Sequence, residues 1–480
     1  MVKQVNTKGS TALGARVVKA IGVFSSVEFI KLLCAVIRTK LVAVLIGAAG
    51  VGVISLYNST LEMLRSVAML NLGQSAVREI STSGGDCRAA VAHEVERTGL
   101  WLGIIAAVVT ALLSPLLSLL AFGSPAHSWA FCVLSLSLLA GAVTDARTAV
   151  LQSFGQIKFL ARASLLGAVS GTLLAVPTYI MWRMDGIVPV ILIYSATTLF
   201  FLMRYKVSRP EAVLSRSDAK ALRRRLIGLG AWLTVASAMG FAALYILRIW
   251  LNAAAGVDAV GKFQAGFTIV NTYAGVLFTA IAMEFYPRLA GVIRSGRATS
   301  VMVGHEITIA LWILIAVVPV FLCLQTLIVR VLYSSEFLIV LQFTAIAIGA
   351  TIFRAISWCF SYVILARADG RVYLITEGAS AVSLVVFGAI GWTAFGFYGL
   401  GLAYLLQYVL FTIVTAIVYF RRYRLNLPRA VSRLIVLSVV VVLGSILIYM
   451  FLGLYGRIVI FLLIPVVIYF AYKNLRNIMA

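Results

Sequence analysis

The sequence predicts an all-α integral membrane protein with about 14 transmembrane helices. Hydrophobic residues make up 62% of the 480-residue chain, charged residues make up 12%, and the mean hydropathy is +1.05. A soluble domain has roughly 45–50% apolar and about 25% charged residues. Apolar segments of helix-spanning length, about 20 residues, recur along the chain, whereas a membrane β-barrel would show alternating strands of about 10 residues. The first apolar segment is not followed by a cleavage motif, so we expect it to be retained as a span and not removed as a signal peptide.

The chain opens with a predicted helical hairpin, Val17–Ile37 and Leu41–Leu70, joined by a short basic connection. Each helix carries a charge pair at i, i+3, a spacing that places both members on one helix face. A charge near the bilayer centre costs roughly 2.5–3.5 kcal/mol, so we expect the hairpin to line a polar path through the membrane. The pairs are Glu28 with Lys31, which could also simply neutralise each other, and Glu62 with Arg65.

The remaining elements follow from apolar length and from polar or proline breaks. A polar connection is expected at Asn71–Thr98, and Pro115 is expected to kink the third span. The predicted spans after the hairpin are about Gly99–Phe122, Ser128–Leu151, Phe159–Met181, Ile187–Tyr205, Leu226–Leu251, Phe263–Tyr286, Glu306–Val329, Phe337–Ala366, Val372–Phe395, Phe397–Phe420, Leu434–Leu454 and Ile458–Tyr472.

These spans group into two six-helix bundles. We expect an N-terminal bundle at 1–205, a basic cytoplasmic linker at 206–225, a C-terminal bundle at 226–420 and a two-helix appendage at 429–476. The second half repeats the first in places, because LIGAAGV at 45–51 is echoed by LNAAAGV at 251–257. An internal repeat of this kind is common among transporters.

The charge distribution predicts the orientation. The net charge of +24 could indicate nucleic-acid binding, but the basic residues are spread over short loops. With the N-terminus inside, about 30 Lys and Arg lie on the cytoplasmic side and about six on the other, as the positive-inside rule requires. Both termini are therefore expected in the cytoplasm, and nucleic acid is not expected as a partner.

Signatures of enzymes, cofactors and metals are not found in the sequence. It has no GxxxxGK[ST] phosphate loop, and neither His93-Glu94 nor His305-Glu306 has the second histidine of a HExxH site. The five cysteines form no CxxC pair, so no zinc site is indicated. We therefore predict no enzyme activity, no cofactor and no metal. A membrane polymerase would need a sizeable external loop, whereas every predicted external connection is short.

Polar residues inside the spans are the candidate site. Arginine suits phosphate because its planar fork makes two parallel hydrogen bonds and its charge persists at physiological pH. The Ser, Thr, Asn and Gln positions could instead only join helices to one another. Our hypothesis is that four cations hold a lipid-linked pyrophosphate, that a polar stripe and tyrosine meet sugar hydroxyls, and that three acids bind a coupling ion. The three groups are Lys31, Arg65, Arg248 and Arg354; Asn58, Tyr245, Gln264 and Asn271; and Glu28, Glu62 and Glu284.

Several segments resemble one membrane-protein family. VGKFQAGFTIVNTYAGVLFTAIAMEFYPRL at 260–289 resembles the VG-F-A---V---Y---------D-YPRL pattern of bacterial O-antigen translocases, although its acid, Glu284, is displaced by one position. These are the Wzx-type polysaccharide flippases of the multidrug/oligosaccharidyl-lipid/polysaccharide (MOP) superfamily. The segments at 40–56, 73–80 and 151–165 are also similar to that family. The resemblance implies twelve to fourteen helices, a V-shaped molecule that opens inward and outward, and lumen arginines at variable positions.

The resemblance also implies a function. A protein of this family moves an undecaprenyl-pyrophosphate-linked oligosaccharide to the periplasmic leaflet of a bacterial inner membrane by alternating access. The expected partners are this substrate, membrane lipids and possible further proteins of polysaccharide assembly. One alternative is a MATE-like drug/cation antiporter, which would favour an acid-rich lumen. The other is a membrane enzyme of glycan assembly, such as a polymerase.

Overall fold

The computed structural model describes residues 30–479 apart from 32, 70–71, 84–86, 205–214, 229–230, 274–284, 286–287, 290 and 368. The described residues form helices joined by turns, with no strand among them, so the prediction of an all-α fold is confirmed. Eight of the described helices are long and apolar enough to cross a membrane, or nine if one bent pair counts as a span. The count of 14 spans stays a prediction.

The surface is inverted relative to a soluble protein. Large apolar side chains such as Leu112 and Phe451 are exposed, whereas Ser, Thr and Gln side chains such as Ser118, Gln325 and Thr344 are buried. In water such extensive apolar exposure would drive aggregation, but in a bilayer the lipid tails solvate it. The chain is thus a multi-pass membrane protein.

The chain divides into two compact units. Unit 1 comprises Met1–Ile46 and Thr60–Thr234, and unit 2 comprises Gly47–Ser59 and Val235–Ala480. Helix α2 (Gly47–Met69) therefore contributes its first part to unit 2 and its remainder to unit 1. The further helices of unit 1 are α3 (Leu72–Thr82), α4 (Cys87–Leu112), α5 (Ser114–Phe122), η1 (Pro125–His127), α6 (Ser128–Ser153), α7 (Ile157–Trp182), η2 (Arg183–Gly186), α8 (Ile187–Met203) and α9 (Arg216–Gly228).

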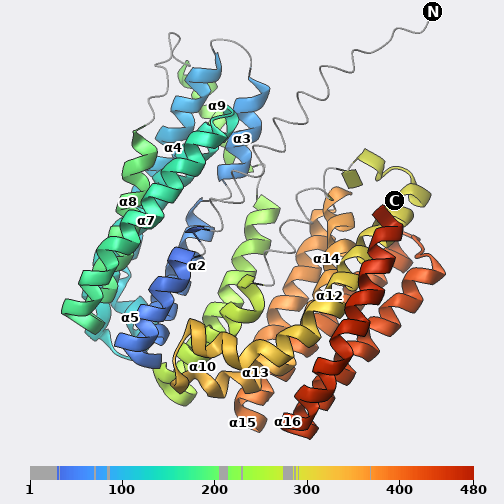
Figure 1. The fold of residues 1–480 in the computed structure, drawn as a ribbon. Coiled ribbons are helices and arrows are strands. Elements are labelled where there is room, and N and C mark those ends of the chain that lie inside the picture. The colour runs from blue at the N-terminus through green and yellow to red at the C-terminus, as the bar shows by residue number, and fades with distance from the viewer. Residues whose placement is uncertain are drawn as a thin grey trace, which may run out of the picture. The chain divides into compact units, whose positions relative to one another are not determined.

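Helices α3 and α9 cover one end of unit 1. The sequence predicts a polar connection over Asn71–Thr98, whereas the structure has α3 and the first turns of α4 there. Leu72, Ala76 and Ile80 recur every four residues on α3 and bury one apolar face. Leu222 and Leu226 of α9 pack into the same cluster. In unit 1, α7 and α8 lie side by side (Figure 1).

Unit 2 is built from long, broken helices. Its elements are α10 (Ala231–Phe267), the π-helix η3 (Thr268–Tyr273), α12 (Gly296–Leu332), η4 (Ser335–Val340), α13 (Leu341–Ala347), α14 (Ala350–Ala366), α15 (Gly370–Ile417), the π-helix η5 (Val418–Arg422) and α16 (Arg429–Met479). In Figure 1, α12 lies beside α14 and α16, as their packing requires.

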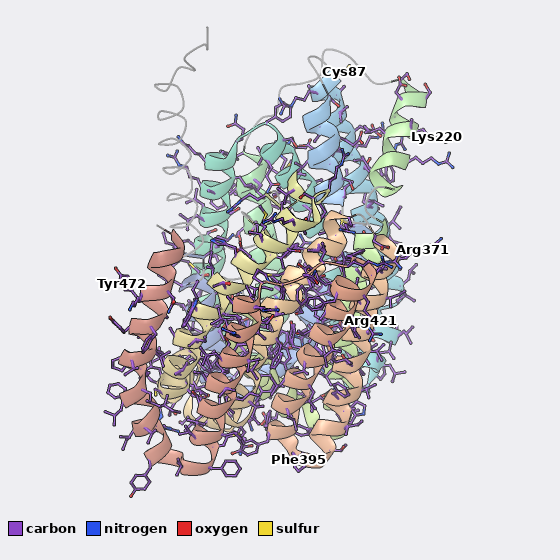
Figure 2. The ribbon with its side chains drawn as sticks, turned by 90° about the vertical axis from the view of Figure 1, so that its right-hand side faces the viewer. Cys87, Lys220, Arg371, Phe395, Arg421 and Tyr472 are labelled. Atoms are coloured by element: carbon purple, nitrogen blue, oxygen red, sulfur yellow. The ribbon has the colours of Figure 1, made fainter. Side chains whose placement is uncertain are left out.

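A glycine turn divides α15 into two antiparallel helices. Gly396 has φ of 57°, a left-handed conformation that glycine adopts without the Cβ clash of other residues. The turn separates the predicted spans that end at Phe395 and begin at Phe397. Figure 2 shows Phe395 at one end of unit 2 and Arg371 and Arg421 at the other. The arginine-rich end is the one that the positive-inside rule predicts to be cytoplasmic.

Candidate functional site

A close helix crossing in unit 2 sets the geometry of the site. The first part of α2 crosses α10 near the two segments that echo each other in the sequence. A Cβ atom at Gly52 would lie 2.1 Å from the backbone oxygen of Val257, and one at Gly261 would lie 1.9 Å from that of Ala48. Two backbones can come this close only where glycine leaves out the side chain. The crossing therefore holds the polar side chains that follow on both helices within reach of one another.

Arg248 is held beside this crossing. Its Nη2 donates to Oε1 of Gln264 at 2.6 Å, and the Ser55 hydroxyl donates to the same oxygen at 3.0 Å. The Gln264 amide nitrogen in turn donates to the Thr268 hydroxyl at 3.0 Å. Arg248 is only 5% exposed. An amide oxygen accepts the hydrogen bond without neutralising the guanidinium, so the bond orients the positive charge and preserves it.

Arg354 of α14 has a similar environment. Its Nη1 donates to Oδ1 of Asn271 at 2.6 Å, and the Tyr404 hydroxyl donates to the same atom at 3.4 Å. Asn271 lies in the π-helix η3, a distortion that is frequent at functional sites. The Arg354 guanidinium carbon lies 4.8 Å from the Trp358 ring centroid, and the side chain is 8% exposed. Guanidinium stacking on an aromatic ring stabilises a cation in a poorly hydrated place.

An aromatic cluster connects the two arginines. The Phe267 ring centroid lies 5.7 Å from the guanidinium carbon of Arg248 and 6.0 Å from the Tyr404 ring centroid. The Tyr404 ring packs on Tyr408, whose centroid is 5.9 Å from the Arg354 guanidinium carbon. The described part of unit 2 therefore contains two buried cations, two side-chain amides and a set of aromatic rings in one connected group, which we call the arginine–aromatic cluster.

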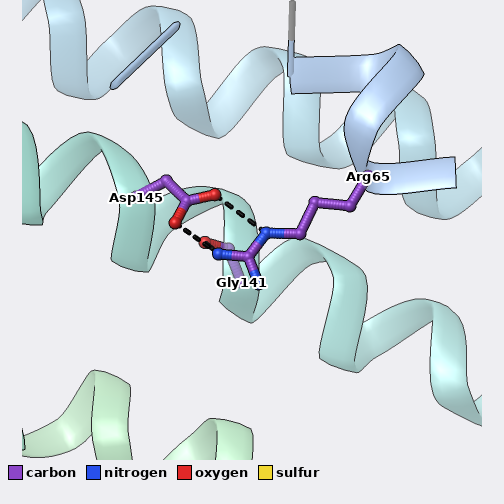
Figure 3. Close-up of polar contacts among 3 residues, drawn as sticks. All are labelled: Arg65, Gly141 and Asp145. Carbon is purple, nitrogen blue, oxygen red and sulfur yellow. Dashed lines mark hydrogen bonds and ion pairs between the residues drawn. The ribbon is translucent and has the colours of Figure 1, made fainter. Parts of the chain in front are cut away.

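Arg65 of α2 belongs to unit 1 and has an acidic partner. Its Nε donates to Oδ2 of Asp145 at 2.8 Å, its Nη2 contacts Oδ1 of the same carboxylate, and Nη2 also lies 3.5 Å from the Gly141 backbone oxygen (Figure 3). The side chains are 42% and 34% exposed. The sequence places Glu62 three residues before Arg65 on the same helix, and the structure adds a carboxylate partner for Arg65 on α6, 80 residues away in the chain.

The other predicted site residues are spread over the structure. Tyr245 is buried on α10, one turn before Arg248, whereas Asn58 and Glu62 are exposed on α2, and Lys31 is half-buried in unit 1. The predicted ion-coupling residues Glu28 and Glu284 lie outside the described residues. Their roles, and those of the other predicted site residues, stay predictions.

Several residues of the site have no clear signal in the sequence. Phe267, Trp358 and Tyr404 look like ordinary apolar positions of a membrane helix, and only their contacts with the arginines distinguish them. Glu377 of α15 is a further acid in a helix apolar enough to cross a membrane, and its Oε1 accepts a hydrogen bond from Ser361 at 3.4 Å. Its charge, rare inside an apolar helix, is a signal that could have been followed. Among the described residues, no group of three His, Cys, Asp or Glu could hold a metal ion.

Comparison with known proteins supports this architecture. The chain has 12% sequence identity to the lipid II flippase MurJ in an inward closed conformation, with a TM-score of 0.70 over 95% of this chain and 99% of that one. An inward-facing multidrug resistance MATE transporter of the MOP superfamily shares 16% identity, with a TM-score of 0.64 over 86% and 98% of the two chains. The outward-facing conformation of such a transporter gives a TM-score of 0.60 at 16% identity, over 87% and 96%.

The sequence matches a family as well as a fold. No curated protein matches the chain. The family model of polysaccharide biosynthesis proteins matches residues 86–342, more than half of the 480-residue chain. This match and the fold confirm the resemblance to MOP-superfamily polysaccharide flippases that the sequence motifs indicate. The chain therefore belongs to the polysaccharide biosynthesis protein family and has the fold of the MOP superfamily.

Proposed function

We propose that this protein is a flippase that moves an undecaprenyl-pyrophosphate-linked oligosaccharide, such as an O-antigen repeat unit, to the periplasmic leaflet. It works by alternating access in a bacterial inner membrane, with both termini in the cytoplasm and without covalent chemistry. The observation that carries this proposal is the arginine–aromatic cluster of unit 2. Membership in the polysaccharide biosynthesis family supports a glycan cargo.

The chemistry of the cluster suits a pyrophosphate. Each buried guanidinium is oriented by an amide oxygen, Arg248 by Gln264 and Arg354 by Asn271. A phosphate bound to a pre-oriented fork gains charge-assisted hydrogen bonds without the entropic cost of ordering a flexible side chain. Because the site is buried, water competes weakly for the same donors.

The same cluster suits a sugar next to the phosphate. Aromatic rings such as Trp358 and Tyr404 offer flat apolar faces with polar edges, and sugars have both C–H surfaces and hydroxyl groups. The amide nitrogens of Gln264 and Asn271 are the donors that we propose for hydroxyls, because both amide oxygens already accept two hydrogen bonds. In unit 1, Asp145 orients Arg65, and we propose that Lys31 and Arg65 contact the pyrophosphate in the course of transport. We propose Glu62, with Glu28 and Glu284, as candidates for ion coupling.

A MATE-like drug/cation antiporter is the second candidate, because chains with that activity share the fold. Electrostatics disfavour it. A cationic drug placed in the cluster would meet Arg248 and Arg354, and like charges in a low-dielectric environment repel strongly. Competition between a cationic dye and the lipid-linked oligosaccharide for the purified protein separates the two functions, because only the antiporter should bind the dye.

The proposal is tested by reconstituting the full chain in liposomes with a labelled undecaprenyl-pyrophosphate-linked oligosaccharide and measuring its accessibility to a membrane-impermeant reagent. A hydrogen bond to a charged group contributes about 1.5–3 kcal/mol, so Arg248→Ala and Arg354→Ala should each slow flipping roughly 10- to 150-fold. Arg371→Ala, an exposed arginine of unit 2, is the matched control and should keep the wild-type rate.

Thermal unfolding of each variant establishes that it is folded before its rate is interpreted. Because Arg248 and Arg354 are buried, Arg→Lys variants provide a second set that keeps the charge and most of the volume. Wild-type flipping by folded Arg248→Ala and Arg354→Ala proteins would refute the proposed role of the cluster.

A further inference from the structure

A second basic site lies at the arginine-rich end of unit 2. A cavity of about 720 Å³ is lined by Arg294, Arg367, Arg422, Asp369 and Tyr423, with apolar surface from Ile293. The residues come from three places in the chain: the segment before α12, the connection between α14 and α15, and the end of η5 with the residue after it. Three guanidiniums meet one carboxylate there, so the pocket has a net excess of positive charge.

One of the three arginines is fixed by the carboxylate. Arg422 contacts Oδ2 of Asp369 through Nε at 3.0 Å and through Nη2 at 2.9 Å. The Tyr423 hydroxyl donates to the same oxygen at 3.2 Å. Burial and the Asp369 carboxylate raise the pKa of the Tyr423 phenol to about 12, so this hydroxyl stays protonated and remains a donor. Oδ2 of Asp369 thus holds both Arg422 and Tyr423 in the pocket wall.

The other two arginines have no carboxylate partner among the described residues. The Arg367 guanidinium carbon lies 4.4 Å from the Tyr423 ring centroid, a stacking contact that fixes the plane of the fork and leaves its edge donors exposed. Arg294, in the segment before α12, is exposed and forms no ion pair within the described part of the chain. Two forks that face one cavity, neither neutralised, are the arrangement that binds phosphate.

The backbone beside the pocket contains a π-helix and a non-glycine residue with positive φ. The π-helix η5 ends at Arg422, and Arg424 adopts φ of 51°, a conformation that costs a non-glycine residue roughly 1–2 kcal/mol. The Leu425 backbone N–H donates to the Tyr419 oxygen at 3.2 Å, and the Leu425 side chain is buried, which holds the segment in this conformation. Such strain clusters at binding sites, where surrounding contacts maintain it.

We propose that this pocket binds the phosphate of an anionic phospholipid headgroup, such as that of phosphatidylglycerol. The pocket lies at the ends of two helices that are long and apolar enough to cross a membrane, Gly296–Leu332 and Gly370–Arg422. Basic pockets between membrane helices on the cytoplasmic side bind anionic headgroups. The pocket is open and polar with an apolar wall, which suits a headgroup attached to acyl chains. This site goes beyond the proposed transport of a glycan and involves none of the residues of the arginine–aromatic cluster.

Native mass spectrometry of the full detergent-purified chain tests the proposal, with phosphatidylglycerol and phosphatidylcholine of the same acyl chains as probes. The wild-type protein should bind phosphatidylglycerol at least tenfold more tightly than the neutral lipid. Each arginine near an anionic membrane surface contributes about a fivefold change in affinity, so Arg294→Gln should weaken binding about fivefold, and a combined Arg294→Ala, Arg367→Ala variant about 25-fold. Arg371→Ala removes one exposed arginine of the same end and should change the affinity less than twofold.

Inorganic phosphate distinguishes a lipid from a soluble anion. At 10 mM it should displace little phosphatidylglycerol, because the lipid also gains contacts with the apolar wall. Complete displacement would identify a soluble-phosphate site and overturn the proposal. Equal binding of the two lipids, or equal weakening by Arg371→Ala and Arg294→Gln, would also overturn it. The measurement contains no glycan cargo, so its failure is separate from a failure of the flippase proposal.

Discussion

The contact between α2 and α10 permits a quantitative prediction from the structure. In Gly261→Ala the new Cβ would lie 1.9 Å from the Ala48 backbone oxygen and 2.8 Å from the Gly52 nitrogen, whereas ordinary contact begins at 3.4 Å. Both opposing atoms are backbone, so no side-chain rotation relieves the clash. The helices would have to separate by about 1.5 Å. Overpacking of an interior costs typically 1–3 kcal/mol, and we expect this case at or above about 3 kcal/mol.

Gly240→Ala is the matched control in α10, on the other side of the helix break at Gly256, whose φ is 80°. A Cβ there has no atom within 4 Å, and alanine in place of glycine favours a helix by about 1 kcal/mol. The two substitutions, chemically identical, should therefore shift stability in opposite directions. Thermal unfolding of the purified full-length variants measures this difference, with a lower Tm for Gly261→Ala and an equal or higher Tm for Gly240→Ala.

The same substitution should affect the site. Separating the helices moves Ser55 away from Gln264, which removes one of the two donors that hold the Gln264 side chain beside Arg248. We expect flipping by any folded Gly261→Ala protein to fall together with its Tm. Equal Tm values for Gly261→Ala and Gly240→Ala would refute the close backbone contact, and with it the reason given for the position of Arg248.

Three further outcomes are expected. Arg354→Lys keeps the charge but loses the planar fork and its stack on the ring, so liposome flipping should fall about tenfold at unchanged protein level. Asp145→Asn removes the charge that pairs with Arg65. Both side chains are about one-third or more exposed, so the free energy of unfolding should change by less than about 1 kcal/mol. Flipping should slow, because the arginine loses its orientation. Leu226→Ala leaves a cavity under α9 that costs roughly 2–5 kcal/mol, so limited proteolysis should cut within α9 faster, whereas exposed Lys220→Ala should not change the cleavage rate.

Much of the fold could be predicted from local patterns in the sequence. The recurrence of long apolar segments determines helices in a membrane, because every backbone donor and acceptor in lipid must be satisfied within the segment. Pro115 breaks the third span between α4 and α5, as the missing backbone donor requires. The amphipathic face of α3 was also present in the four-residue spacing of its apolar residues, yet the neighbouring charges make that segment resemble a loop.

Within a single helix, side chains on one face also follow from spacing. Gln264 and Thr268 are four residues apart and do form a hydrogen bond. The candidate arginines could be identified from the sequence alone, because a charged side chain in an apolar segment has a high free-energy cost in lipid and is therefore a candidate for a functional role. These inferences depend only on the geometry of one helix.

The partners of the arginines depend on tertiary structure. Asp145 pairs with Arg65 across 80 residues, Asn271 with Arg354 across 83, and Ser55 with Gln264 across 209. Helix periodicity does not predict contacts between residues so far apart in the sequence, because these contacts depend on which helices pack together and at what separation. Small residues at the α2–α10 crossing determine that separation in unit 2. The sequence by itself thus determined that this is a helical membrane protein with costly cations, and the packing of the helices decided what each cation contacts.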